Sequence, residues 1–234
     1  MDRVNDMKTA LVTGANKGIG FAIAEGLGTL GFRVAVGARD DVRREEAVER
    51  LRAKGIDAFG VALDVTSDDS VRTAAQALDR LDVLVNNAGI GGPFPQDPTT
   101  LDLGVVRTVL DTNVFGVVRV TNAVLPLLRK AEAPRIVNVS SNMGSLALRT
   151  GPIMAAYAPS KSMLNSLTVQ YARALADTNV IINACCPGYV ATDFTGHASD
   201  RTPEQGAAIA VRLATLPGDG PRGGFFDDGG DIPW

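Results

Sequence analysis

The sequence has little of what several classes of protein require. Its 234 residues include two cysteines and one histidine, and the cysteines, Cys185 and Cys186, are adjacent within an apolar stretch. This set supports neither a disulfide framework nor a four-ligand zinc site, because no cysteine or second histidine lies at a ligand spacing from His197. We therefore expect no metal site.

Long apolar runs and an excess of basic residues are also missing. No run approaches the roughly 18–20 apolar residues of a membrane span, and Met1–Lys8 has no basic segment followed by an apolar one. A net charge of −3 gives no general attraction to a phosphate backbone. We expect a cytoplasmic protein that binds neither membranes nor nucleic acid.

Apolar residues make up 45% of the chain, which is enough to build a sizeable core. No internal repeat, low-complexity tract or linker divides it, so a single domain over residues 1–234 is expected. Short, β-branched and almost continuously apolar runs alternate with longer stretches of helical periodicity. This order predicts an α/β fold: a doubly wound, parallel, Rossmann-like sheet with helices on both faces.

The periodicity also gives the bounds of these elements. The predicted strands are Thr9–Thr13, Arg33–Ala38, Ala58–Val65, Val83–Asn86, Arg135–Ser140 and Val180–Cys186. The predicted helices are Ile19–Leu30, Arg43–Lys54, Asp68–Asp79, Leu103–Lys130, Tyr157–Ala176 and Pro203–Leu216. Gly89–Pro98 and Pro217–Gly230 are predicted loops, and Gly223–Trp234 could add a short edge strand and a tail.

A glycine-rich turn, Thr13–Gly20, joins the first strand to the first helix. Without a Cβ at Gly14, Gly18 and Gly20, backbone N–H groups and the helix N-terminus can approach a pyrophosphate closely. The spacing Gly-x3-Gly-x-Gly matches neither the Gly-x-Gly-x-x-Gly fingerprint nor the P-loop. A purely structural turn is the alternative, but the strand before it and the helix after it favour a dinucleotide site.

The end of the second predicted strand bears on the choice between the two nicotinamide cofactors. An acidic residue there would hold the adenosine ribose hydroxyls and exclude a 2′-phosphate. Ala38 occupies that position and Arg39 follows it, while Lys17 from the glycine turn can converge on the same place. This small cationic pocket favours NADP(H). The alternative is a solvated Arg39, or an Arg39 that pairs with Asp40.

Tyr157 and Lys161 lie four residues apart where a helix is expected to begin. This spacing puts both side chains on one helix face, where the ammonium would lower the pKa of the phenol toward neutrality. Pro159 requires the helix to begin near Tyr157, because a first-turn residue needs no intrahelical N–H partner. Alone, such a pair is more often a surface pair than a catalytic one.

Together these motifs resemble the short-chain dehydrogenase/reductase family, and within it the NADPH-dependent carbonyl reductases most. They occur in the family's order and cover nearly the whole chain, from about Lys8 to Trp234. The residues that carry the resemblance are Thr13–Gly20, Gly37–Asp40, Leu63–Val65, Asn86–Gly89, Asn113, Ser141, Tyr157, Lys161, Pro187, Gly188, Thr192 and Asp231–Trp234.

The resemblance implies an NADP(H)-dependent oxidoreductase that interconverts a ketone or aldehyde and an alcohol by hydride transfer. Tyr157 would donate or accept the proton, and Ser141 would hydrogen-bond the substrate oxygen. Lys161 would lower the pKa of Tyr157 and hold the nicotinamide ribose, while Asn113 would anchor a water for proton relay. The implied cofactor-binding residues are Gly14, Asn16, Lys17, Gly18, Ile19, Gly20, Arg39, Leu63, Asp64, Val65, Asn87, Ala88, Gly89, Tyr157, Lys161, Pro187, Gly188, Val190 and Thr192.

One departure from the family concerns the catalytic serine. Ser141 and Tyr157 are 16 positions apart, a few more than is common in the family, so the loop Met143–Ala156 must bulge. Ser141 is preferred over Ser140 because Asn142-Met-Gly144 follows it, as in the family's Ser-x-x-Gly turn, and Ser145 is the fallback.

The rest of the prediction concerns partners and alternatives. The family's large insertion before the tyrosine is missing, which leaves the helices Leu103–Lys130 and Tyr157–Ala176 free to form a homodimer or homotetramer. A short polar loop near residues 193–202 suggests an open cleft for a small, mostly apolar carbonyl compound, and His197 is better explained as a solvated loop residue than as a substrate contact. The alternatives are an NADP(H)-sensing regulatory protein without turnover and a nucleotide-sugar epimerase, for which too little chain follows Cys186.

Overall fold

The structure, a computed structural model, describes residues 7–148 and 150–234. Its described residues form a sheet in the order β3-β2-β1-β4-β5-β6-β7-β8. The strands are β1 (Thr9–Thr13), β2 (Arg33–Ala38), β3 (Ala58–Ala62), β4 (Val83–Asn86), β5 (Arg135–Val139), β6 (Ile181–Cys185), β7 (Phe225–Asp227) and β8 (Gly230–Asp231). Neighbouring strands pair in parallel except β7 and β8, which are antiparallel. The predicted Rossmann-like α/β fold is confirmed.

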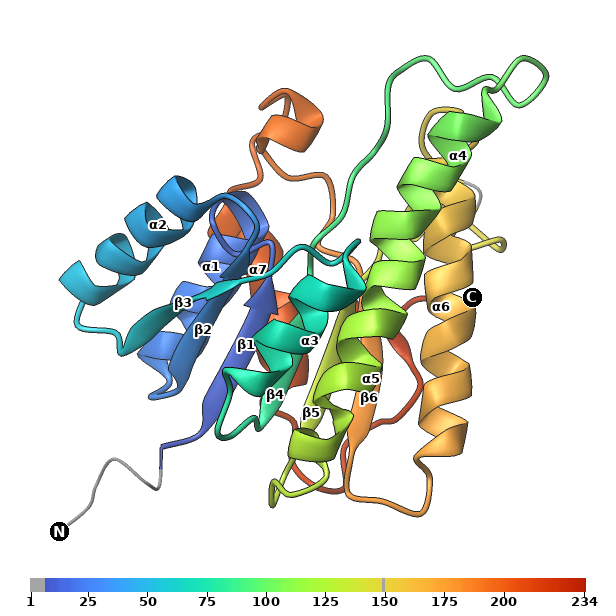
Figure 1. The fold of residues 1–234 in the computed structure, drawn as a ribbon. Coiled ribbons are helices and arrows are strands. Elements are labelled where there is room, and N and C mark those ends of the chain that lie inside the picture. Colours follow the sequence, from blue (N-terminus) through green and yellow to red (C-terminus); the bar gives the residue numbers. More distant parts are fainter. Residues whose placement is uncertain (1–6, 149) are drawn as a thin grey trace, which may run out of the picture.

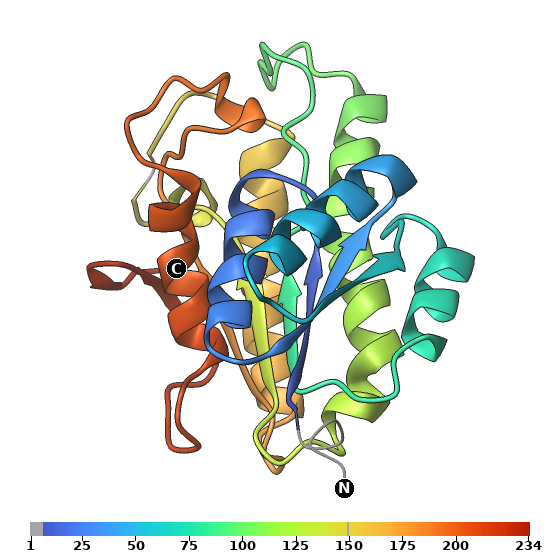
Figure 2. The same cartoon turned by 90° about the vertical axis from the view of Figure 1, so that its left-hand side faces the viewer.

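The helices cover both faces of this sheet (Figures 1 and 2). They are α1 (Gly18–Thr29), α2 (Asp41–Ala53), α3 (Asp68–Gln76), α4 (Leu103–Leu110), α5 (Gly116–Leu128), α6 (Tyr157–Ala174) and α7 (Pro203–Ala214). Helices α1, α2 and α7 pack on one face, and α3, α5 and α6 pack on the other. A π-helical segment, Asp111–Phe115, joins α4 to α5, and short 3₁₀ helices lie at Asn142–Gly144 and Asp193–Thr195.

Burial on both faces explains why the strands are almost continuously apolar. In β1, Ala10 and Val12 pack against α1 and α7, whereas Leu11 points to the opposite core beneath α3 and α5. Successive strand residues alternate between the two faces, so a sheet covered by helices on both sides needs apolar residues at every position.

Polar caps set the starts of several helices. Asp40 caps α2 by accepting a hydrogen bond from Arg43 N at 3.0 Å, so this helix begins two residues before the predicted start. Thr202 caps α7 in a reciprocal capping box with Gln205, and Pro203 occupies the first turn, where no intrahelical N–H partner is needed. The capped start of α7 agrees with the predicted one.

Four predicted features differ from the structure. The helix Leu103–Lys130 is not continuous α-helix, because the π-helical segment interrupts it. The strand predicted to reach Val65 ends at Ala62, where Asp64 turns the chain by accepting from Thr66 N at 2.9 Å. The predicted loop Pro217–Gly230 contains β7, whose Phe225 is buried, and antiparallel β8 makes the sheet mixed rather than wholly parallel. The short edge strand predicted within Gly223–Trp234 is confirmed, because β8 ends the sheet. None of the helices in residues 7–148 and 150–234 is long and apolar enough to cross a membrane.

Candidate active site

The predicted site residues gather along one edge of the sheet. The glycine turn follows β1, the Asn86–Gly89 segment follows β4, Ser141 follows β5 and Pro187 follows β6. Because these strands are parallel, their carboxyl ends lie at the same edge, which is the upper edge in Figure 1. This edge is where ligands bind in open α/β sheets.

The glycine turn is locked against the segment after β4. Gly14 and Gly18 have φ values of 65° and 55°, which favour glycine. A Cβ at Gly20 would lie 2.4 Å from Asn87 Nδ2, so no side chain fits there. Thr13 Oγ1 accepts hydrogen bonds from Asn87 N at 3.0 Å and Ala88 N at 2.9 Å. Thr13 is not among the predicted site residues, although it is the first residue of the glycine turn, which is a signal that the sequence contains.

Arg39 keeps a free guanidinium at the carboxyl end of β2. Asp40, its potential partner, caps α2 and lies 3.8 Å from Arg43 Nε. Within the described part of the chain, Arg39 forms no ion pair with a carboxylate, and its side chain is exposed. Hydrogen bonds from Thr66, aided by the charge of Arg39, lower the pKa of Asp64. Arg39 therefore lies near Asp64, where the resemblance places the adenine end of the cofactor.

Lys17 is paired with a carboxylate, because its Nζ lies 2.5 Å from Asp193 Oδ2, and its convergence with Arg39 on one phosphate stays a prediction. The pair closes one side of a cavity of about 330 Å³ between the glycine turn, α2 and the loop after β6. The residues that line this cavity are Asn16, Lys17, Arg43, Glu46, Ala47, Arg50 and Asp193. Asn16 thus shares this cationic hollow with Lys17, at the phosphate end of the predicted cofactor site.

The phenol of Tyr157 lies near a serine that follows β5. Tyr157 is the first residue of α6 and is 9% exposed, and the nearby Ser141 side chain acts to lower the pKa of its phenol. The other two candidate serines are engaged elsewhere. Ser140 Oγ donates to Asn165 Oδ1 at 2.6 Å, and Ser145 Oγ donates to the Pro233 carbonyl at 2.6 Å. Ser141 Oγ makes longer contacts, accepting from Met143 N at 3.2 Å and donating to Asn142 Oδ1 at 3.4 Å. Its proximity to the phenol favours Ser141 as the partner of Tyr157.

Lys161 is buried beside Tyr157, with its Nζ 5.6 Å from the centre of the phenol ring. Within the described residues, this ammonium donates one hydrogen bond, to the Val139 carbonyl at 2.8 Å. Burial lowers the pKa of Lys161 to about 8. Burial has the opposite effect on Tyr157 and raises the pKa of its phenol, because the charged form is the phenolate. The nearby Ser141 side chain offsets only part of this increase in pKa. The predicted lowering of the Tyr157 pKa is thus wrong for the protein alone, because desolvation of the phenolate dominates.

Asn113 lies in the π-helical segment between α4 and α5, and its side chain is fully buried. Its Nδ2 donates to the Ile90 carbonyl at 2.9 Å and to Ser160 Oγ at 3.0 Å, and its Oδ1 accepts from Ile90 N at 2.8 Å. The side chain therefore ties the loop after β4 to α6. The predicted role of Asn113 in anchoring a water stays a prediction.

The remaining predicted cofactor residues line the same edge. Pro187 O accepts from Arg201 Nε at 2.8 Å, and the following Gly188 has a φ of 79°. Thr192 packs on the glycine turn, since a Cβ at Gly18 would lie 3.3 Å from the Thr192 methyl group. The other predicted cofactor residues are apolar or glycine. Ile19, in α1, packs against the core, and Leu63, Val65 and Val190 are buried. Ala88 is partly buried, and Gly89 lies beside Lys161 and Asn113.

Comparison with known proteins agrees with this arrangement. Residues 8–203 match the short chain dehydrogenase family. The chain belongs to this family. Carbonyl reductase (NADPH) 1 of Rattus norvegicus is 34% identical over 280 residues, covering 98% of this chain and 99% of that protein. Members of the family are oxidoreductases, and so is this chain.

Solved structures of two related enzymes share the fold. The salutaridine reductase of Papaver somniferum superposes with a TM-score of 0.84 at 29% identity, covering 94% of this chain and 99% of that chain. A variant of actinorhodin polyketide ketoreductase, solved with NADPH, superposes with a TM-score of 0.85 at 31% identity, covering 96% and 97%. The single Rossmann-like domain is therefore the family's domain.

Two further residues, Phe194 and Gln96, lie at the site and are not among those predicted from the sequence. The Phe194 ring packs on that of Tyr157, with centroids 5.2 Å apart and planes tilted by 51°. Gln96, from the loop after β4, is 1% exposed and contacts the start of α6. Neither belongs to a motif, so the only signal was their position in loops after strands. His197 is exposed, as predicted, and its Nε2 lies 3.0 Å from Asp193 Oδ1.

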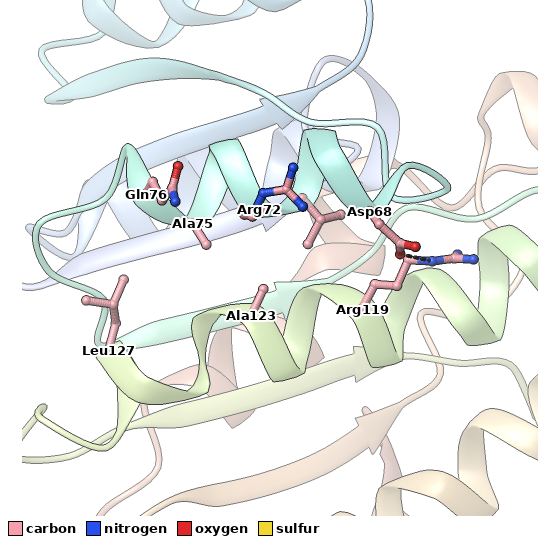
Figure 3. Close-up of a pocket in the computed structure, with 8 residues that line it drawn as sticks. Asp68, Arg72, Ala75, Gln76, Arg119, Ala123 and Leu127 are labelled. Carbon is pink, nitrogen blue, oxygen red and sulfur yellow. Dashed lines mark hydrogen bonds and ion pairs between the residues drawn. The ribbon is translucent and has the colours of Figure 1, made fainter.

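A second hollow, of about 350 Å³, lies away from this site, between α3 and α5 (Figure 3). The residues that line it are Asp68, Val71, Arg72, Ala75, Gln76, Arg119, Ala123 and Leu127. Arg119 forms an ion pair with Asp68 at 2.8 Å, and the remaining lining is largely aliphatic. This groove holds no side chain of the predicted catalytic set, so it is a surface feature of the dehydrogenase rather than its reaction centre.

Proposed function

We propose that the protein is an NADP(H)-dependent oxidoreductase of the carbonyl reductase type, which interconverts a ketone or aldehyde and an alcohol. The observation that carries this proposal is the buried Tyr157 phenol, which has Ser141 close to it and the Lys161 ammonium 5.6 Å from the centre of its ring. The 34% identity to a protein named carbonyl reductase (NADPH) 1 supports the same reaction.

The residues present fit NADP(H). Gly14 and Gly18 have positive φ values, and a Cβ at either position would press on Ala88 or Thr192, so the turn keeps a conformation in which backbone N–H groups can approach a pyrophosphate. Arg39, exposed at the end of β2, forms no ion pair with a carboxylate among the described residues and offers its guanidinium where a 2′-phosphate would lie. The Lys161 ammonium donates one hydrogen bond to protein among the described residues and has two further N–H donors for ribose hydroxyls.

The cofactor supplies the hydride that reduces the carbonyl carbon, and the chain supplies the rest of the chemistry. Ser141 would donate a hydrogen bond to the carbonyl oxygen, where negative charge develops, and Tyr157 would transfer its proton there. Burial raises the pKa of Tyr157 and so keeps the phenol protonated at neutral pH, which is the form that carbonyl reduction requires. The Lys161 ammonium stabilises the phenolate that remains.

The surroundings of Tyr157 favour an apolar substrate. Large apolar side chains are exposed on the loops at this edge of the sheet: Phe94, Leu146, Leu148, Ile153, Tyr189 and Phe194.

We also propose a homodimer or homotetramer, because Leu103, Phe115 and Met163 are exposed on the helical segments around α4 and α6. Sedimentation of the protein tests this, and a monomer at micromolar concentration overturns it.

The decisive experiment incubates the protein with a panel of ketones, aldehydes and quinones and follows the absorbance of NADPH, with NADH in parallel. Turnover with NADPH supports the proposal, whereas binding without consumption identifies a sensor. Tyr157→Phe should abolish turnover and leave NADPH binding unchanged. Tyr171→Phe is the matched control, because Tyr171 lies on the same helix and its hydroxyl donates to Asn122 Oδ1 at 2.8 Å. Substantial activity in Tyr157→Phe contradicts the assignment.

A further inference from the structure

The side chain of Gln96 spans the loop after β4 and the start of α6. Its Oε1 accepts from Ala156 N at 2.9 Å and from Tyr157 N at 3.3 Å. Its Nε2 donates to the Gly91 carbonyl at 2.6 Å and to the Pro93 carbonyl at 3.0 Å. The side chain is 1% exposed, so both ends of the buried amide have their partners in the protein.

This contact replaces the missing cap of α6. The helix begins at Tyr157, and the preceding residue, Ala156, has no side chain that can accept a hydrogen bond. The first N–H groups of a helix have no intrahelical partner and need an acceptor from elsewhere. Gln96 supplies it from 60 positions away in the sequence. The backbone reinforces the contact, because Ala155 N donates to the Gln96 carbonyl at 3.2 Å.

The capped residue is the proposed proton donor itself. A phenol on the first helical residue moves with any fraying of that turn, whereas a phenol deeper in the helix would not. The same loop also lies close to Phe194, since a Cβ at Gly91 would lie 3.0 Å from Phe194 Cζ, and the Phe194 ring packs on Tyr157. Gln96 therefore joins the backbone of Tyr157 to the loop that contacts Phe194, the ring packed on its phenol.

We propose that Gln96 is a positioning residue for the reaction, which holds the first turn of α6 so that the Tyr157 phenol stays in register with Ser141. This inference rests on the proposed function, in which Tyr157 is the proton donor. Displacement of a reacting group by about 1 Å can cost about 100-fold in rate. The loss of this tether should thus appear in the chemical step rather than in cofactor binding.

The test compares Gln96→Leu with Asn183→Leu. Asn183 is the matched control, because it is also a buried amide that joins two backbone segments: its Nδ2 donates to the Pro221 carbonyl at 2.7 Å and its Oδ1 accepts from Gly224 N at 2.9 Å. Gln96→Leu should lower kcat by about 10- to 100-fold and leave the Kd for NADPH unchanged. The isotope effect on kcat with NADPH deuterated at the transferred position should increase, because hydride transfer becomes rate-limiting. Asn183→Leu should lower thermal stability while leaving kcat and the isotope effect unchanged.

Hydrogen–deuterium exchange gives a readout that needs no turnover. In Gln96→Leu, the amides of Ala156 and Tyr157 should exchange faster, whereas in Asn183→Leu they should not. Unchanged exchange, or a wild-type kcat and isotope effect in Gln96→Leu, overturns the proposal. A wild-type protein that shows no turnover but the predicted exchange difference refutes the proposed function and leaves the tether as a property of the fold alone.

A second variant covers the case in which Gln96→Leu does not fold. Gln96→Glu keeps an acceptor for the amides of Ala156 and Tyr157 and loses the donors to Gly91 and Pro93. It should retain the slow exchange of both amides and a kcat well above that of Tyr157→Phe. Fast exchange of those amides together with wild-type kcat would show that the tether does not position the phenol.

Discussion

Lys17 and Asp193, which are 176 positions apart in the sequence, form a 2.5 Å ion pair that joins the glycine turn to the loop after β6. Asp193 also pairs with His197 on the opposite side, and the hydrogen bonds from Lys17 and then His197 lower the pKa of the Asp193 carboxyl. Lys17, one of the two cations predicted to meet the 2′-phosphate, is thus held by a carboxylate of the loop near residues 193–202. A phosphate must compete with Asp193 for Lys17.

Asp193→Asn should therefore strengthen the binding of NADPH. Both partners of the pair are about half exposed and solvent screens their attraction, so the Kd for NADPH should fall by only a few-fold. The Kd for NADH should not change if Lys17 binds the 2′-phosphate. Titration of protein fluorescence with each cofactor at low and high salt measures both values.

Glu25→Gln is the matched control for this prediction, because it removes a similar ion pair, Lys54 with Glu25 at 2.6 Å, away from the cofactor site. It should change neither Kd. Weaker NADPH binding in Asp193→Asn would mean that the carboxylate orients Lys17 for the phosphate rather than competing with it, which contradicts the prediction.

Arg39 should set the preference for NADP(H). Replacement by alanine removes a charge-assisted hydrogen bond worth about 1.5–3 kcal/mol, so KM for NADPH should increase by about 10- to 100-fold with little change for NADH. Arg39→Asp should in addition improve activity with NADH, because a carboxylate there can hold the ribose hydroxyls. Arg33→Ala, at the opposite end of β2, is the control. Equal wild-type rates with both cofactors, or an Arg39→Asp variant that loses NADPH activity without gaining any with NADH, would overturn the cofactor assignment.

Much of the fold can be predicted from the sequence because the physical signal is local. Strand β1 is apolar at all its central positions and is followed at once by the glycine turn, so both its bounds and its neighbour are evident. The start of α6 follows from Pro159, which fits only in a first turn. The Tyr157 and Lys161 pair likewise follows from helix geometry alone.

The features that escaped prediction depend on contacts between distant residues. A π-helical segment has nearly the same apolar periodicity as an α-helix, so Asp111–Phe115 looks like part of one long helix. The Lys17–Asp193 pair and the Gln96 contacts each join a motif to a distant loop residue, Asp193 or Gln96, that belongs to no motif. The pKa of Tyr157 depends on how deeply the phenol is buried, which spacing does not reveal.

Two of the three candidate serines near β5, Ser141 and Ser145, should have different functions. Ser141→Ala removes the hydrogen bond to the developing oxyanion and should lower kcat by about 100- to 1,000-fold, with little effect on folding. Ser145→Ala, the control, loses the bond to the Pro233 carbonyl and should lower the unfolding free energy by about 1 kcal/mol with kcat preserved. Single-turnover kinetics and thermal unfolding measure both effects. The reverse pattern would assign the catalytic role to Ser145.

Lys161 should cost stability at neutral pH, because its charge is buried. The pKa of this ammonium falls to about 8 in the folded chain from the ordinary 10.5, so the unfolded chain binds more protons between these values. The free energy of unfolding therefore increases as pH rises from about 8 toward 10.5. Below pH 8 the buried charge of Lys161 lowers it by the full amount, about 3 kcal/mol.

Lys161→Met removes this penalty together with the proposed catalytic function. The variant should be inactive, yet its advantage in unfolding free energy over the wild type should be largest at pH 7 and shrink by pH 9.5. Lys161 Nζ can donate to the Val139 carbonyl in either protonation state, so the pH-dependent part of the difference reports the buried charge alone. Lys54→Met controls for the loss of an exposed lysine. Urea unfolding at the two pH values measures the difference, and a constant difference between them would show that Lys161 keeps its charge in the folded protein throughout this range.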